Sequence, residues 1–340
     1  MTQPFSNEQR AYLAAAEQCG GRVAPLLDAL RVLDPAALGP QPASGGTAER
    51  FRFLAAVAEA DVTAARVIEP HLDAIAILRE SGADAPPAGR TWGVFAAEAP
   101  GAGLLATERR DAGGWQLDGV KPWCSLGAQV TDALITARTD AAERRMFSVD
   151  LRQQGVHAEP VEWVARGLAE VESGPLEFGG AVAEPVGEAG WYLTRPGFRW
   201  GAIGVAACWW GGCLPLYAAL RARAGRDGAG PLAAAAAGRL HRALEGARLQ
   251  LAHAGDVIDA GGLDPHAAAV LAHTVRGQVA DTVVEVLGAV RDVLGPAALA
   301  FDESIARRYA DLDLYVSQYH RGPDDVSLFE HLRGEAGPAW

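Results

Sequence analysis

The sequence predicts an α+β protein in which helical segments precede and follow a β-rich middle. Apolar residues recur at three- and four-residue spacing over residues 7–80, which is typical of amphipathic helices. Residues 91–191 are instead rich in glycine, tryptophan and valine, in short alternating runs. The helical pattern returns near residue 196 and continues. We therefore expect three domains, at residues 1–88 (helical), 89–193 (a β-barrel or β-sandwich) and 194–340 (a four-helix bundle).

The first helical segment contains two long amphipathic runs. Apolar residues repeat at helical spacing in NEQRAYLAAAEQCGGRVAPLLDALRVL and in TAERFRFLAAVAEADVTAARVIEPHLDAIAILRE. A loop rich in proline, glycine and serine, LGPQPASGG, separates them. Thr47, followed by Glu49 and Arg50, marks the expected start of the second run.

The middle segment has strand-like runs at roughly strand-plus-turn spacing. These runs are TWGVFAA, GLLATERR, GWQLDGVKPW, DALITAR, RMFSVDL and SGPLEFGG, with turn signals such as DAGG and DLRQQG between them. About one hundred residues of this kind suggest a small sandwich or barrel.

The last segment contains four long helical runs with glycine or proline breaks. They are RWGAIGVAACWWGGCLPLYAALRARAG, GPLAAAAAGRLHRALEGARLQLAHAGDVIDAGG, DPHAAAVLAHTVRGQVADTVVEVLGAVRDVLG and FDESIARRYADLDLYVSQYH. Their number and length are typical of an antiparallel four-helix bundle.

Composition and charge argue against several classes of protein. Apolar residues make up 49% of the 340 residues and charged residues 21%, which indicates a globular chain. The formal net charge of −12 would repel nucleic acid and anionic membranes. The start MTQPFSNEQR lacks the pattern of a secretory signal, and charged residues interrupt the alanine-rich stretches. We expect a cytoplasmic protein with a small-molecule substrate and no nucleic-acid or membrane partner.

Cysteines and common motifs give no metal or nucleotide site. The four cysteines form no CxxC pair, which suits a reducing compartment. The sequence has no HExxH, and no ExxH pair lies on the C-terminal helices, so we expect no metal site. It also lacks a P-loop, a GxSxG motif, and a GxGxxG motif between a strand and a helix.

The turn GVKPWCSLG carries a large aromatic side chain, Trp123, and a hydroxyl two residues later, Ser125. Loops usually shed bulky apolar groups. The indole of Trp123 therefore either fills a seam of the core or presents its face to a planar ligand. Ser125 would point the same way as Trp123 in an extended segment.

Several motifs occur in an order that resembles the acyl-CoA dehydrogenase family over nearly the whole chain. AAEAPGAGL (Ala96–Leu104) is followed by KPWCSLG (Lys121–Gly127), DALITAR and MFSVDLRQQGV, and Arg199 in RWGAIGVAACWWGG stands at the family's arginine. The resemblance implies a helical domain, a β domain and a four-helix bundle that bind FAD. It also implies hydride transfer from an acyl thioester or related small substrate to flavin N5, in a homodimer or homotetramer.

The resemblance assigns cofactor contacts to particular residues. Trp123 would pack on the isoalloxazine ring, and the hydroxyl of Ser125 would hydrogen-bond near N5. The chain departs from the family where Ala97 replaces a threonine and Leu104 replaces a serine, and each change removes a hydroxyl. The remaining cofactor-binding candidates are Phe95, Ala97, Gly103 and Cys124 in the β domain, and Arg223 and Arg226 for the pyrophosphate.

The catalytic base of the family has no carboxylate counterpart here. The usual glutamate position near the C-terminus aligns with Tyr319 or His320, and the second family position is Phe198. Three interpretations remain open. His320 could act as the base, or Asp324 or Asp325 could approach the site, or the protein could be a flavin-dependent monooxygenase that uses reduced flavin and oxygen. A relative that has lost FAD and serves as a binding or scaffold subunit is a fourth possibility.

Three further residues, His71, Trp209 and Trp210, could border the acyl pocket that the resemblance implies. For His71, in EPHLDA, we expect a capping or surface role. Trp209 and Trp210 are adjacent on one helix, where side chains point about 100° apart, so we expect at least one of them in the core.

Overall fold

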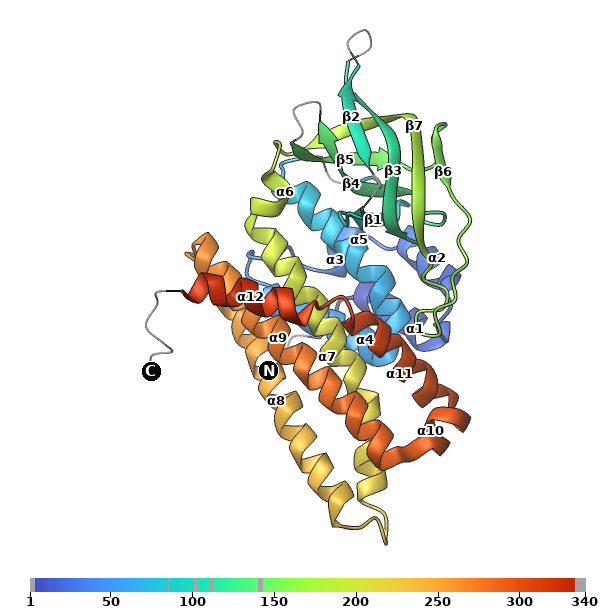
Figure 1. Ribbon diagram of the computed structural model, residues 1–340, viewed down its shortest axis with the longest axis vertical. Coiled ribbons are helices and arrows are strands. Elements are labelled where there is room, and N and C mark those ends of the chain that lie inside the picture. The colour runs from blue at the N-terminus through green and yellow to red at the C-terminus, as the bar shows by residue number, and fades with distance from the viewer. Residues whose placement is uncertain (1–3, 85, 101–102, 110–112, 140–142, 334–340) are drawn as a thin grey trace. The chain divides into compact units, whose positions relative to one another are not determined.

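The computed structural model describes residues 4–84, 86–100, 103–109, 113–139 and 143–333 (Figure 1). The chain forms two compact units. The first unit comprises Met1–Gly39 and Arg66–Phe198, and the second comprises Pro40–Ala65 and Arg199–Trp340. Helix α5 (Val62–Glu80) and helix α7 (Pro196–Ala224) each cross from one unit to the other. The division into three sequential domains stays a prediction.

The N-terminal helices of the first unit are short, and side chains cap the starts of two of them. In α1 (Asn7–Cys19), the side chains of Ser6 and Gln9 bond each other's backbone N–H groups in a capping box. Helix α2 (Ala24–Val32) follows, and α3 (Pro35–Leu38) starts at a proline that Asp34 precedes as N-cap. The first predicted run is therefore two helices, because the glycines after Cys19 end α1 in the left-handed region.

The β segment forms one sheet whose pairings close on themselves. Its strands are β1 (Trp92–Phe95), β2 (Leu104–Glu108), β3 (Trp115–Ser125), β4 (Asp132–Thr139), β5 (Arg144–Asp150), β6 (Val156–Ala158) and β7 (Ser173–Val186). The order is β1-β4-β2-β3-β7-β5, β6 pairs with β7, and β5 pairs with β4. Strands β4, β2, β3, β7 and β5 therefore form a closed ring, as in a small barrel.

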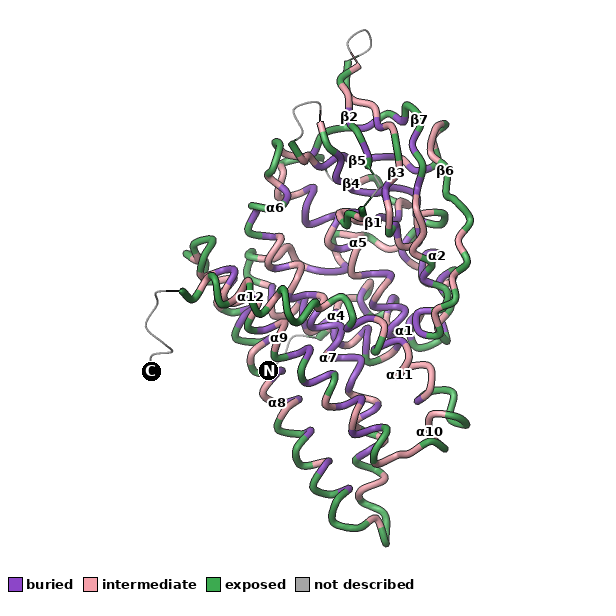
Figure 2. The backbone as a smooth tube through the Cα atoms, in the orientation of Figure 1, coloured by how far each residue is buried: buried purple, intermediate pink, exposed green. Residues whose placement is uncertain are grey.

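One apolar cluster joins α5 to the sheet within the first unit. Ala74, Ile77 and Leu78 of α5 pack against strand residues that include Trp92 and Leu134. Burial alternates along much of β2 and β7, as expected for one face on the core, whereas β4 is buried over six consecutive residues (Figure 2). Apolar area removed from water stabilises by roughly 25 cal/mol per Å², so this cluster holds α5 against β1 and β4.

A buried arginine closes the end of this cluster. Arg195 follows the short helix α6 (Trp191–Thr194) and is 3% exposed. Its guanidinium pairs with Glu80 at 2.6 Å and with Asp73 at 3.6 Å. Two carboxylates compensate its burial, which would otherwise be costly.

The second unit is helical throughout its described residues. Helix α4 (Thr47–Ala60) packs on α8 (Pro231–Ala260), which packs on α9 (Pro265–Ala289). The chain continues through a π-helical turn (Val290–Leu294) and α10 (Gly295–Phe301). Helices α11 (Glu303–Val316) and α12 (Arg321–Leu332) both contact α9, and Figure 1 shows α12 crossing it. Each of the four predicted runs thus contains a helix, while their arrangement as a bundle stays a prediction.

Helix α7 is long and apolar enough to cross a membrane by length and composition alone. However, 61% of its apolar window is buried inside the protein, as in a core helix. Trp209 in this helix is fully buried, with its ring edge-to-face with Tyr315 and under the guanidinium of Arg276. The neighbouring Trp210 donates its indole N–H to the carbonyl of Leu244. The expectation of a core role for at least one of the two tryptophans is confirmed.

Two sequence expectations concern buried polar groups. His71 is fully buried, and its Nδ1 accepts the backbone N–H of Trp92 at 3.3 Å. The expectation of a surface or capping role for His71 was therefore wrong, because Pro70 and His71 face the sheet side of α5. All four cysteines are free and buried. Among the described residues, no three His, Cys, Asp or Glu side chains lie together as a metal site would require.

Candidate functional site

A bulge in β3 projects Trp123 out of the sheet. Lys121 pairs with Leu176 of β7, and Cys124 pairs with Gly174. Pro122 and Trp123 of β3 therefore lie opposite a single residue of β7. Proline has no N–H for the ladder, which favours a bulge at this point. The indole of Trp123 is 58% exposed. The interpretation that it fills a seam of the core is therefore wrong for the first unit.

The same turn holds two residues in the left-handed backbone region. Trp123 has a φ of 57° and Leu126 a φ of 58°. Residues with a side chain pay steric energy at such angles, and they persist only where the surroundings hold them. Here the backbone N–H of Leu126 donates to the carbonyl of Glu172 at 2.7 Å. The turn is thus held in a strained shape that presents an exposed indole.

The hydroxyl of Ser125 lies in a polar network at the end of β3. It accepts an N–H of Arg66, on α5, at 2.9 Å. It also lies 2.7 Å from the hydroxyl of Ser173, its direct partner across the β3–β7 ladder. Ser173 in turn donates to the carbonyl of Val171 at 3.2 Å. All of these groups belong to the first unit.

Ser125 and Arg66 line a cavity of about 290 Å³, a volume that includes space open to solvent. Its other walls are mostly apolar and come from α5, from β1 and from the turn, and they include Pro70, Phe95 and Leu126. Much of this volume is open to solvent, so the enclosed space is smaller than a typical ligand site. A depression of this size would take one part of a larger ligand.

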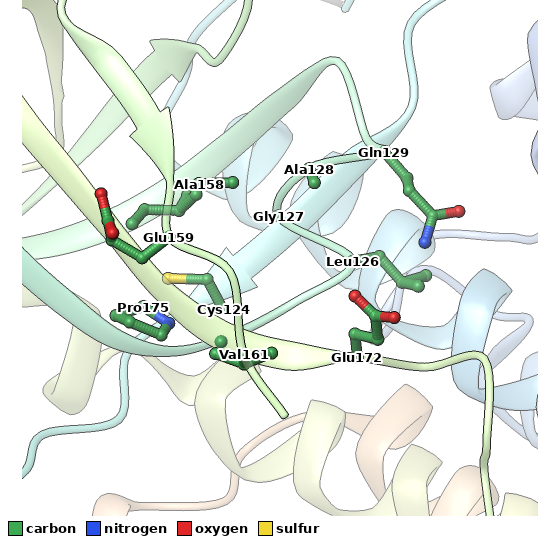
Figure 3. A pocket seen from close by; sticks show the side chains of 12 residues that line it. Cys124, Leu126, Gly127, Ala128, Gln129, Ala158, Glu159, Val161, Glu172 and Pro175 are labelled. Carbon is green, nitrogen blue, oxygen red and sulfur yellow. The ribbon is translucent and has the colours of Figure 1, made fainter. Parts of the chain in front are cut away.

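A second cavity, of about 310 Å³ including space open to solvent, lies on the other side of the turn (Figure 3). The thiol of Cys124 faces this cavity, as Figure 3 shows, and the carboxylates of Glu159 and Glu172 lie along its wall. Burial raises the pKa of the Cys124 thiol to about 12, so the thiol stays protonated and is a poor nucleophile. Cys124 thus lines the second cavity, whereas the adjacent Ser125 lines the first.

Lys121, two residues before Trp123, has a structural role. Its ammonium is 1% exposed and donates to Glu98 at 3.0 Å and to both oxygens of Thr136 at 2.9 Å. Burial lowers the pKa of Lys121, and Glu98 partly offsets this effect. All three donors are used, so Lys121 anchors β3 to β4 and to the loop after β1.

The remaining predicted cofactor contacts are dispersed. The ring of Phe95 is buried and covers Gly93, where an added Cβ would lie 2.6 Å from it. Ala97 and Gly103 are exposed, and the carbonyl of Gly103 accepts the N–H of Val120. Gly101 and Ala102 of the same motif lie outside the described residues. Two predicted contacts belong to the second unit, namely Arg223 at the end of α7 and Arg226 in the turn after it.

Comparison with known proteins identifies the fold. No family model and no curated protein matches the sequence. The chain is nevertheless similar in structure to the dibenzothiophene monooxygenase TdsC of Paenibacillus sp. A11-2, in a complex with FMN and indole. The two are 16% identical, the match covers 97% of this chain and 96% of that chain, and the TM-score is 0.78. The chain has the acyl-CoA dehydrogenase-like fold.

Two further proteins of the acyl-CoA dehydrogenase-like fold match over similar lengths. KijD3, in complex with FMN and a dTDP-linked amino sugar, is 19% identical over 97% of this chain and 93% of its own, with a TM-score of 0.77. Butyryl-CoA dehydrogenase from Megasphaera elsdenii is 16% identical over 98% of this chain and all of its own, with a TM-score of 0.74. The predicted resemblance is confirmed at the level of the fold.

The two positions where acyl-CoA dehydrogenases hold a base have other surroundings here. Phe198 packs on the apolar cluster of the first unit, edge-to-face with Tyr192 at 5.4 Å. In the second unit, Tyr319 donates its hydroxyl to Asp325 at 3.0 Å, and burial raises the pKa of Tyr319 to about 12. His320 is exposed and precedes α12 as its N-cap, where its N–H donates to Asp324. His320 as catalytic base stays a prediction.

Arg66 and Ser173 were not predicted from the sequence. Arg66 lies 59 residues and Ser173 lies 48 residues from Ser125 along the chain. One signal was available: Arg66 and Pro70 are four apart on a helix whose other positions are largely apolar, and both border the cavity. Ser173 carried no signal, because its place depends on the register between β3 and β7.

Proposed function

We propose that this protein binds a flavin at the Trp123 turn and is a flavin-dependent oxidoreductase. The exposed indole on the bulge supports this proposal, because a strained backbone that presents an aromatic face suggests a binding role. The residues present fit a flavin ring in three respects. Trp123 would cover a flat ring, Ser125 and Arg66 would address its polar edge, and the apolar wall near Phe95 would exclude water.

The form of the flavin is a separate part of the proposal. The resemblance favours FAD, with Arg223 or Arg226 on its pyrophosphate. TdsC and KijD3 are both described with FMN. We propose FAD as the first form to test and FMN as the second.

Among flavin-dependent reactions, we favour monooxygenation, and one observation carries this choice. Dehydrogenation needs a base that takes the α-proton while hydride leaves the β-carbon. Neither family position holds a carboxylate: one is Phe198, in an apolar cluster, and the other is Tyr319 or His320. Tyr319 bonds Asp325. When bound, reduced flavin would supply two electrons, so that one oxygen atom enters the substrate and the other leaves as water.

The second candidate is an acyl-CoA dehydrogenase-like reaction with His320 as base. The structural similarity to butyryl-CoA dehydrogenase favours it. Neutral imidazole can accept a proton near pH 7. The third candidate is a binding or scaffold subunit that holds no flavin.

Titration with oxidised and reduced FAD and FMN tests the flavin site. We expect binding by the wild type, with quenched tryptophan fluorescence. Trp123→Ala should weaken binding about ten-fold or more, because stacking on the ring is lost. Phe301→Ala is the matched control, since its ring is 89% exposed in α10 and has no place in the proposed site. Equal affinity of Trp123→Ala and the wild type would reject this site.

A second experiment separates the two reactions. Under anaerobic conditions, a panel of acyl-CoA thioesters should leave the bound oxidised flavin unreduced. With reduced flavin and oxygen, a panel of small aromatic and sugar-nucleotide substrates should contain one that is oxygenated. Bleaching by any acyl-CoA, with loss of bleaching in His320→Ala, would instead establish the dehydrogenase.

The oligomeric state is the last part of the proposal. Helix α12 has no buried residue, and Val326 and Phe329 on it are each 61% exposed. Exposed apolar residues grouped on one helix favour association. We propose a cytoplasmic homodimer or homotetramer, and sedimentation velocity at micromolar concentration would show a monomer if this is wrong.

A further inference from the structure

The hydrogen bonds around Ser125 run in one direction. Arg66 donates to Ser125, the hydroxyls of Ser125 and Ser173 lie 2.7 Å apart, and Ser173 lies 3.2 Å from the carbonyl of Val171. A guanidinium can only donate and a carbonyl can only accept. Each hydroxyl has one hydrogen, so all three contacts are hydrogen bonds only when Arg66 donates to Ser125, Ser125 to Ser173 and Ser173 to Val171.

The direction leaves Ser125 without a hydrogen for a ligand. In this arrangement Ser173 donates its hydrogen to Val171, so the hydrogen between the two serines comes from Ser125. One lone pair of Ser125 receives the N–H of Arg66, and a second lone pair remains. At the cavity that it lines, Ser125 is therefore an acceptor.

We propose that Arg66 and Ser173 are positioning residues that make the Ser125 site selective for reduced flavin over oxidised flavin. This inference rests on the proposed function. N5 of oxidised flavin is an acceptor, whereas N5 of reduced flavin carries a hydrogen. An acceptor at Ser125 matches the N–H of the reduced form only.

Ser173 and Arg66 both favour binding of the reduced flavin. To donate to an oxidised flavin, Ser125 must take its hydrogen from Ser173, and Ser173 must then release the carbonyl of Val171. Losing one neutral hydrogen bond corresponds to about a ten-fold difference in affinity. The positive charge of Arg66 adds to this preference, because reduced flavin is largely anionic at neutral pH. Together they favour the reduced form about ten-fold or more.

Anaerobic titration with reduced and oxidised FMN and FAD measures the selectivity. It is expressed as the dissociation constant of the oxidised flavin divided by that of the reduced flavin. We expect Ser173→Ala to lower the wild-type ratio about ten-fold, because Ser125 regains a hydrogen to donate. Ser173→Thr keeps the hydroxyl and should keep the ratio. Arg66→Met should lower the ratio, and Arg66→Lys should retain most of it, since the charge and a donor remain. Ser148→Ala, which removes a half-buried hydroxyl from β5, is the control.

The outcomes are distinguishable. Flavin binding with a ratio that neither Ser173→Ala nor Arg66→Met changes by more than two-fold overturns this inference and leaves the proposed function standing. A wild type that binds neither form overturns both. If Ser173→Ala does not fold, the ratios measured for Arg66→Met and Arg66→Lys test the inference instead. The midpoint potential of the bound flavin is an independent readout. It should fall by roughly 30 mV for each ten-fold decrease in the ratio.

Discussion

Trp123 combines an exposed indole with a left-handed backbone angle, and its neighbour Leu126 shares that angle. Four non-glycine residues have a positive φ among those the structure describes, and two of them lie in this turn. Strain of this kind costs of order 1–3 kcal/mol for each residue and tends to occur at binding sites. A glycine at position 123 would adopt this backbone angle without the steric cost. A tryptophan at this angle therefore favours the proposed role of its ring in binding a flavin.

We expect substitutions of Trp123 to differ in their effect on stability but not in their effect on flavin binding. Trp123→Gly should be more stable than Trp123→Ala by up to about 1 kcal/mol, because glycine adopts the left-handed angle without steric cost. Both variants should lose flavin affinity equally, because neither has a ring. Urea unfolding monitored by circular dichroism gives the stability, and titration gives the affinity. If alanine proves more stable than glycine here, the backbone angle is not strained.

At the scale of residues, the sequence predicted two residues of the candidate site. It singled out Trp123 and Ser125, because a bulky aromatic in a turn followed by a hydroxyl is unusual. It missed Arg66 and Ser173, whose contacts depend on the packing of α5 and on the β3–β7 register. It was wrong about His71, because a histidine within a helix gives no sign of which face is covered.

At the scale of elements, several hydrogen bonds and an ion pair support the break between α4 and α5. Asp61 is 1% exposed, and one of its oxygens accepts the N–H groups of Thr63 and Ala64 at the start of α5. Its other oxygen pairs with Arg307 of α11 at 2.7 Å. The neighbouring Arg308 donates to the carbonyls that end α4. Helix α11 thus holds the backbone groups that the break leaves unpaired.

We expect Asp61→Ala to lower the free energy of unfolding by about 3 kcal/mol. The variant loses an N-cap and leaves Arg307 without its closest carboxylate. Asp264→Ala is the matched control, because Asp264 also caps a helix, α9, but at an exposed site. That control should cost about 1 kcal/mol. Chemical denaturation of the two variants gives the comparison, and equal losses would mean that the ion pair with Arg307 contributes nothing.

The sequence predicted the presence of helices and strands better than their limits. The second N-terminal run was expected as one segment, but Asp61 divides it into α4 and α5, since the pattern of apolar residues continues across the break. The third C-terminal run ends in a π-helical turn before Gly295, which periodicity cannot show. Strand β3 was expected as a strand and a turn, and its bulge depends on pairing with β7.

At the scale of the whole chain, the compact units cut across the order of the sequence. The first unit combines α1–α3 and most of α5 with the sheet, and the second combines α4 with α7–α12. Composition changes along the chain suggested sequential domains. They could not reveal this grouping, since α4 and α5 have the same helical pattern but pack on different partners.

Buried thiols occur in both units and predict a loss of stability at high pH. Burial raises the pKa of Cys124 and of Cys213 to about 12, from 9.0 for the free thiol. Above pH 9 the unfolded chain releases these protons, while the folded chain keeps them until about pH 12. Each thiol's contribution is thus complete below pH 9. It falls by about 1.4 kcal/mol per pH unit as the pH rises toward 12.

The double variant Cys124→Ala and Cys213→Ala should therefore unfold with a shallower dependence on pH than the wild type. Its stability at pH 8 will be lower, because two buried side chains are shortened. Between pH 9.5 and 11, however, the slope of its unfolding free energy should be less negative by up to about 2.7 kcal/mol per pH unit, the sum over two thiols. Urea midpoints under reducing conditions give both quantities. Parallel curves for the two proteins would show that the folded thiols ionise as readily as exposed ones.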